Sequence, residues 1–149
     1  MTSKQGSAID VLRFEQDKVL ALLDKYPSSG NLEEQQKESE VANLVHHFNI
    51  LAEMELAVLY PAVADKCDEG LVDRFVECHN HIKVLTAGVQ RMVGDDEGYD
   101  EQVAELIAAM QKHIKEEEQQ LFPALERCEI DFDALGKKLA ESRDALISG

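Results

Sequence analysis

The sequence contains no tryptophan, and aromatic residues make up only 5% of its 149 residues. Sheets favour aromatic and β-branched residues, whereas this chain is rich in alanine, leucine, glutamate and lysine, which favour helices. No stretch alternates apolar and polar residues as a half-buried strand would. These absences predict an all-α protein.

Positive charge is also scarce, with 15 lysines and arginines against 30 acidic residues and a formal net charge of −15. Such a surface repels nucleic acid and anionic membranes, so we expect neither as a partner. No apolar run approaches the roughly 20 residues of a membrane span. The opening MTSKQGSAID lacks the apolar centre of a signal peptide. The sequence therefore predicts a cytoplasmic protein.

Cysteine is limited to Cys67, Cys78 and Cys128, and the chain has no C-x-x-C motif. An odd number of cysteines is unlike a disulfide framework. We expect free thiols, as in a reducing compartment. Cys67 and Cys128 nevertheless stand in nearly matching places of two similar segments, so a bridge between them is the alternative.

The chain is long enough for one domain with a real core, and we treat residues 1–149 as a single domain. The 3.6-residue period of its apolar residues predicts five helices. They span about 7–25, 32 to the middle 60s, 71–93, 99–127, and 131 to the C-terminal end, where Asp131 is a candidate N-cap. The turn formers of YPSSGN and GDDEG separate neighbouring helices. Short connections predict an up-down-up-down four-helix bundle, with a short fifth helix across one end.

One helical segment occurs twice, as LAEMELAVLYPAVADKC (51–67) and HIKEEEQQLFPALERC (113–128). With Glu55 placed on Glu117, the pattern E-x-x-x-L-[YF]-P-A-[VL] matches without a gap. Each copy carries a proline that we expect to kink or end its helix. Four residues before the shared glutamate, however, the second copy has a histidine where the first has a leucine.

Several polar residues fall on stripes that should face the bundle core. Taken alone, an inward histidine or glutamate is more often a satisfied core group than a ligand. Two buried carboxylates nevertheless need a proton, a lysine or a metal ion between them. Two inward imidazoles favour the metal, because nitrogen and oxygen ligands suit iron, manganese or zinc. The inward polar residues are Gln16, Glu55, His79, His113 and Glu117.

The other histidines are not expected to be ligands. At 100° per residue, His46 and His81 point away from the inward stripes, and His47 lies on a flank. Lys83 follows His79 by one helical turn; we expect its charged end to reach solvent, with an internal countercharge as the alternative.

The sequence resembles the hemerythrin-like, HHE cation-binding family over most of its length. The resemblance rests on AIDVLRFEQDKVLALLDKY, both ExxxL[YF]PA segments, ECHNHIKVL, HIKEEEQQLFPALER and DALGKKLAESRDALI. The family pattern implies a histidine on helix one, H-x-x-x-E on helix two, a histidine on helix three and H-x-x-x-E on helix four, holding two irons. The chain matches it at Glu55, His79, His113 and Glu117. It departs at Gln16 and Leu51, which stand where the family has histidines.

Both departures fall on the half of the family's centre that serves one iron. The resemblance therefore implies a single ion, with iron favoured and manganese or zinc as alternatives, held by the four matching residues. Gln16 would lend an amide oxygen or bind a metal-bound water. The implied functions are binding of oxygen or nitric oxide, or sensing or storage of metal, rather than catalysis.

Two other functions stay open from the sequence. A metal-free bundle would serve as a structural or protein-interaction module, with its glutamates protonated, paired with lysine or solvated. A mononuclear iron oxygenase would use a facial set of ligands. The sequence shows no substrate-orienting motif, nucleophile–base pair or phosphate loop to support the oxygenase.

Overall fold

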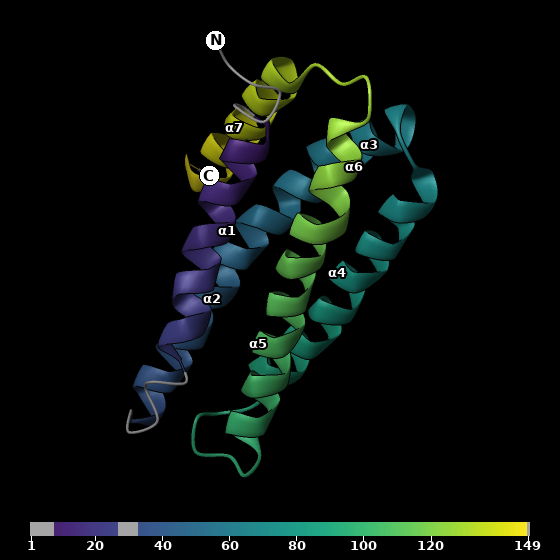
Figure 1. Cartoon of the computed structure of the whole chain (residues 1–149). Coiled ribbons are helices and arrows are strands. Elements are labelled where there is room, and N and C mark those ends of the chain that lie inside the picture. Colours follow the sequence, from purple (N-terminus) through teal and green to yellow (C-terminus); the bar gives the residue numbers. More distant parts are fainter. Residues whose placement is uncertain (1–7, 27–32, 149) are drawn as a thin grey trace.

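The computed structural model describes residues 8–26 and 33–148, and this part of the chain is helical without any strand (Figure 1). The elements in order are α1 (Ala8–Lys25), α2 (Glu34–Met54), η2 (Glu55–Leu59), α3 (Tyr60–Lys66), α4 (Glu69–Gln90), α5 (Tyr99–Glu116), η3 (Glu117–Leu121), α6 (Phe122–Glu126) and α7 (Phe132–Ser148). The predicted turn over 27–31 and the predicted helix starts at Ser7 and Leu32 lie outside the described residues.

The helices form the predicted bundle. The segments α2, η2 and α3 make one continuous helix, and α5, η3 and α6 make another. Figure 1 shows the chain running in alternate directions through α1, α2, α4 and α5. The all-α fold class is therefore confirmed.

The fifth helix is short, as expected, but its placement differs from what we expected. α7 has 17 residues against 18 in α1, and it lies along α1 and α2 rather than across one end (Figure 1). Leu135 and Leu139 bury its apolar face. Arg143, further along α7, reaches the buried Glu15 of α1 at 3.7 Å. Packing on α1 thus gives α7 both an apolar surface and a charged partner.

Helix ends in the bundle follow ordinary capping chemistry. The Asp68 side chain accepts a hydrogen bond from the backbone N–H of Leu71 at 3.1 Å, at the start of α4. Asp131 does the same for the N–H of Ala134 at 3.0 Å, which confirms it as the cap of α7. Gly98 precedes α5 with φ of 86°, a conformation that glycine adopts without strain. In the described residues, no helix is long and apolar enough to cross a membrane.

Each copy of the repeated segment contains one π-helical turn, and each turn begins at the shared glutamate. The backbone N–H of Tyr60 donates to the carbonyl of Glu55, five residues back. The N–H of Phe122 donates to the carbonyl of Glu117 in the same way. Pro61 and Pro123 follow directly. Proline cannot donate a backbone hydrogen bond, and a local change of helical register lets the chain pass this position. The expected kink or end is thus a π turn, and helix continues beyond it.

The expectation of free thiols at Cys67 and Cys128 was wrong, because the structure joins them in a disulfide. Their Cα atoms lie 5.6 Å apart, within the range that a disulfide requires. The two copies run side by side to the same end of the bundle, which brings cysteines 61 positions apart in sequence together. Cys78 is free and half-buried.

Candidate metal centre

The four residues predicted as ligands meet in the core of the bundle. Glu55, His113 and Glu117 are completely buried, and His79 is 2% exposed. Nε2 of His79 lies 2.9 Å from Oε1 of Glu55, and Nε2 of His113 lies 3.2 Å from the same oxygen. Nε2 of His113 is also 3.4 Å from Oε2 of Glu117. Two α-helices, α4 and α5, and the two π turns thus bring two carboxyls and two imidazoles together.

Tyr60 lies at the centre of this cluster, and sequence analysis missed it. Its hydroxyl donates to Oε2 of Glu117 at 2.8 Å and is 3.3 Å from Oε1 of Glu55. It is also 3.0 Å from Nε2 of His79 and 3.4 Å from Nε2 of His113. The repeat could have indicated Tyr60, because this residue places a hydroxyl where the second copy has the apolar Phe122.

Gln16 is buried beside the cluster, as its place on the inward stripe predicted. Its amide nitrogen donates to Oε1 of Glu117 at 3.0 Å. It therefore orients one oxygen of that carboxyl, while Tyr60 binds the other. Leu51, where the family resemblance implied a histidine, is completely buried and supplies only hydrocarbon.

Aromatic side chains enclose the two imidazoles. The ring centroids of His79 and His113 are 4.3 Å apart, and the two rings meet edge to face. Phe48 packs on both of them, at 5.9 Å from His79 and 6.1 Å from His113. Phe75 lies 5.7 Å from His113. This apolar shell keeps water away and strengthens the electrostatic interactions inside.

Burial and mutual charge shift the acidities within the cluster. Burial, reinforced by the charge of Glu55, raises the pKa of Glu117 to about 8. Burial and the charge of His113 lower the pKa of His79 to about 4. Burial alone would lower the pKa of His113, but Glu117 and hydrogen bonds outweigh it and raise that pKa. Burial, followed by the two carboxylates, raises the pKa of Tyr60 well above its usual value. At neutral pH these shifts favour the protonated forms of Tyr60, His113 and Glu117.

The donor set fits a metal ion. One ligand atom each from Glu55, His79 and His113 lie within 4.8 Å of one another. Among the described residues, Oε2 of Glu55 and Nδ1 of His113 are buried without a hydrogen-bond partner. A buried carboxylate oxygen without a partner is costly, and a cation would satisfy it. Glu117 borders this group of three through its contact with His113.

The histidines not expected to be ligands differ in exposure from the candidate ligands. His46 and His81 are exposed, and His47 is half-buried. Lys83 is exposed, as predicted. Glu15 is a buried carboxylate that sequence analysis did not single out. It is 3% exposed and paired with Lys18 at 3.4 Å, in addition to Arg143 of α7.

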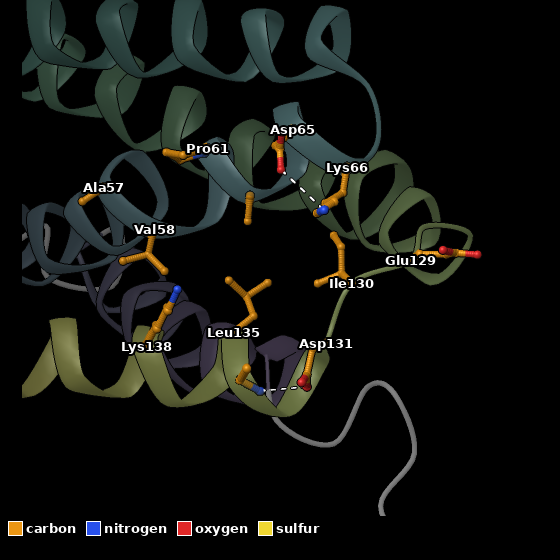
Figure 2. Close-up of a pocket in the computed structure, with 12 residues that line it drawn as sticks. Ala57, Val58, Pro61, Asp65, Lys66, Glu129, Ile130, Asp131, Leu135 and Lys138 are labelled. Carbon is orange, nitrogen blue, oxygen red and sulfur yellow. Dashed lines mark hydrogen bonds and ion pairs between the residues drawn. The ribbon is translucent and has the colours of Figure 1, made fainter.

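The largest cavity described lies apart from the cluster. It has a volume of about 590 Å³ and separates η2 and α3 from the start of α7 (Figure 2). Val58 and Leu135 project into it from opposite walls (Figure 2). None of the four predicted ligands lines it.

Comparisons with known proteins agree with this arrangement. Residues 7–125 match the protein family described as the hemerythrin HHE cation binding domain. The fold is similar to the crystal structure of a hemerythrin HHE cation binding domain-containing protein, the Rv2633c homolog from Mycobacterium kansasii. The TM-score is 0.85 at 19% identity, over 95% of this chain and 88% of that one. No curated protein matches the sequence.

Proposed function

This chain belongs to the hemerythrin HHE cation-binding family, and we propose that its buried cluster holds one divalent metal ion. Iron is favoured, with manganese or zinc as alternatives, because the donors are imidazole nitrogens and carboxylate oxygens. Glu55, His79, His113 and Glu117 would be the ligands. Two carboxylates, two neutral imidazoles and a divalent ion add up to no net charge, which a buried site tolerates best.

The observation that carries the proposal is the completely buried carboxyl of Glu55. Its Oε1 lies 2.9 and 3.2 Å from the two imidazole nitrogens, and its Oε2 has no hydrogen-bond partner. A single ion is favoured over two because of the residues at the other family positions. Leu51 offers no donor atom, and Gln16, whose amide nitrogen binds Glu117, offers only a weak amide oxygen in place of an imidazole. The chain thus retains ligands for one half of a dinuclear centre.

When bound, iron would supply a position where a diatomic molecule such as oxygen or nitric oxide can coordinate. The residues of the chain would hold the ion and orient its ligands. Gln16 fixes one oxygen of Glu117, and Phe48 and Phe75 exclude water from the imidazoles. Tyr60 keeps its proton at neutral pH, since its pKa is raised, and so acts as a hydrogen-bond donor. We propose a cytoplasmic binding, sensing or storage protein rather than an enzyme.

A metal-free structural module is the second candidate, and one observation favours it. The hydroxyl of Tyr60 lies within 3.4 Å of all four predicted ligands, so protons alone join most of the cluster. Under this alternative, chelators would leave the melting temperature unchanged.

Metal content per chain separates the two candidates. We expect the protein, purified without added metal and then loaded with Fe(II) without oxygen, to hold one equivalent by elemental analysis. The variant His113→Ala should lose it, whereas the exposed control His81→Ala should retain it. Two equivalents in the wild type would contradict the single-ion site. Full occupancy in His113→Ala would contradict the ligand assignment, and none in the wild type would favour the metal-free module.

A further inference from the structure

A second cavity borders the cluster at one predicted ligand, His79. It has a volume of about 350 Å³ and is lined by residues of α2 and α4, including His79. Its polar lining comes from Asn49, Glu53, Lys83, Thr86 and Gln90. We call it the α2–α4 groove. The larger cavity of Figure 2 contacts none of the predicted ligands, so the groove is the better route to the ion.

Phe48 separates the groove from the cluster. It lines the groove, is only 2% exposed, and packs on the rings of both His79 and His113. A small molecule that passed from the groove to the metal would have to move this ring. Side chains change rotamer far more readily than the packed backbone moves, so Phe48 forms a movable barrier.

The groove carries a positive charge close to His79. Lys83 follows His79 by one turn on α4, which places the two side chains on the same face of the helix. Lys83 and His79 both line the groove, and Glu53 lines it from α2. On a chain with a net charge of −15, a lysine in this groove is a local attraction for anions.

We propose that the α2–α4 groove admits small inorganic anions to the metal on its His79 side, with Phe48 as the barrier and Lys83 as the attracting charge. This inference rests on the proposed metal site. The volume supports it, because about 350 Å³ accommodates a triatomic anion with several waters, each of about 30 Å³. Larger organic ligands would have to displace Phe48 entirely.

The first test places larger side chains in the groove to block it. Azide association with the iron-loaded protein would be followed by stopped-flow absorbance. We expect the series Ala87→Val, Ala87→Leu and Ala87→Phe to slow association progressively, to about tenfold for phenylalanine. The matched control is Ala134→Phe in the larger cavity, which should associate at the wild-type rate. Equal slowing by Ala87→Phe and Ala134→Phe, or none along the series, would overturn the route.

The second test separates charge from space. We expect Lys83→Met to slow association of azide several-fold at low salt and less at high salt, because screening weakens steering. Association of neutral nitric oxide should be unchanged, and Lys83→Arg should retain the wild-type azide rate. Equal slowing of azide and nitric oxide by Lys83→Met would contradict the attracting role.

The outcomes also distinguish this inference from the proposal on which it rests. Iron content and circular dichroism would be measured on every variant first. A wild-type chain that binds no iron overturns both proposals. A chain that binds iron, with rates unaffected by the Ala87 and Lys83 variants, overturns the groove alone.

Discussion

The two copies of the repeated segment share a backbone and differ in chemistry. In both, a glutamate opens a π turn, an aromatic residue follows five positions later, and a proline comes next. The first copy has Leu51 and Tyr60 where the second has His113 and Phe122. Each copy thus has one polar and one apolar side chain at these two positions, in opposite order.

This exchange leaves the polar groups on one side of the pair. Tyr60 of the first copy reaches His113 of the second, and both meet His79 of α4. Phe122 instead lies under the guanidinium of Arg13 of α1, at 5.5 Å. A repeated helix can therefore keep its backbone geometry while its polar side chains gather on one side of the pair.

The largest effect should come from placing histidines at the two positions where this chain departs from the family pattern. We expect the double variant Gln16→His/Leu51→His to raise the iron capacity from one to two ions per chain, because it supplies the two histidines that the family pattern has there. Elemental analysis of loaded protein measures it. The control Gln16→His/Leu44→His places the second histidine at another buried position of α2 and should stay at one. A folded double variant that still binds one ion would show that the two copies differ in more than these side chains.

The disulfide between the two copies should contribute next. Loop-closure entropy for cysteines 61 positions apart corresponds to about 4 kcal/mol of unfolding free energy. We therefore expect Cys67→Ser/Cys128→Ser to lower stability by about that amount in denaturant titrations. Cys78→Ser, which breaks no bridge, is the matched control. A double variant as stable as Cys78→Ser would mean that the copies are held together without it.

Tyr60→Phe makes the first copy like the second at this position. Without the hydroxyl, the carboxyls of Glu55 and Glu117 lose a buried donor, so the metal-free protein should lose about 1–3 kcal/mol. The stabilisation gained on adding metal should increase, because the ion no longer displaces that donor. Thermal melts with and without chelator measure both effects. Tyr26→Phe, whose hydroxyl bonds Asp100 at the surface, should change neither.

The last effect concerns pH in the metal-free protein. Between pH 6.5 and 8, folded Glu117 and His113 retain protons that the unfolded chain releases, since both pKa values are raised. Stability should therefore fall as pH rises, by at most about 1.4 kcal/mol per pH unit for each proton. His79, with its pKa lowered to about 4, acts in the opposite direction only below pH 6.5.

Urea titrations at pH 6.5 and 8 with chelator present measure this slope. Glu117→Gln should flatten it, and Glu118→Gln, at the exposed neighbouring position, should not. A slope that is the same in both variants would place the retained protons elsewhere.

Periodicity alone predicted the helices and the burial of the four candidate ligands. Regular α-helix leads up to Glu55 and Glu117, and His79 and His113 lie within α4 and α5, so 100° per residue holds for all four. Tyr60 could not be found this way. In a regular helix it would lie about 140° from Glu55, and the π turn brings it back to the same face.

Other features depended on contacts between distant segments. Glu15 is buried where α7 packs on α1 and is paired there with Arg143, and no local pattern reveals that pair. The bridge between Cys67 and Cys128 needs both helices to end at the same level. The number of cysteines suggested free thiols, but composition carries no information about which helix ends lie side by side.

The central hydroxyl of Tyr60 also bears on which cations this protein could accept. Because it already contacts all four predicted ligands, loading is an exchange in which an incoming ion replaces existing hydrogen bonds. Magnesium and calcium prefer oxygen donors and bind imidazole weakly, so they gain too little to drive that exchange. Transition metals bind imidazole nitrogen more strongly, so their binding would compensate for the lost hydrogen bonds. Tyr60 would thus contribute to metal selectivity, because magnesium or calcium would not bind strongly enough to replace its hydrogen bonds in the folded, metal-free bundle.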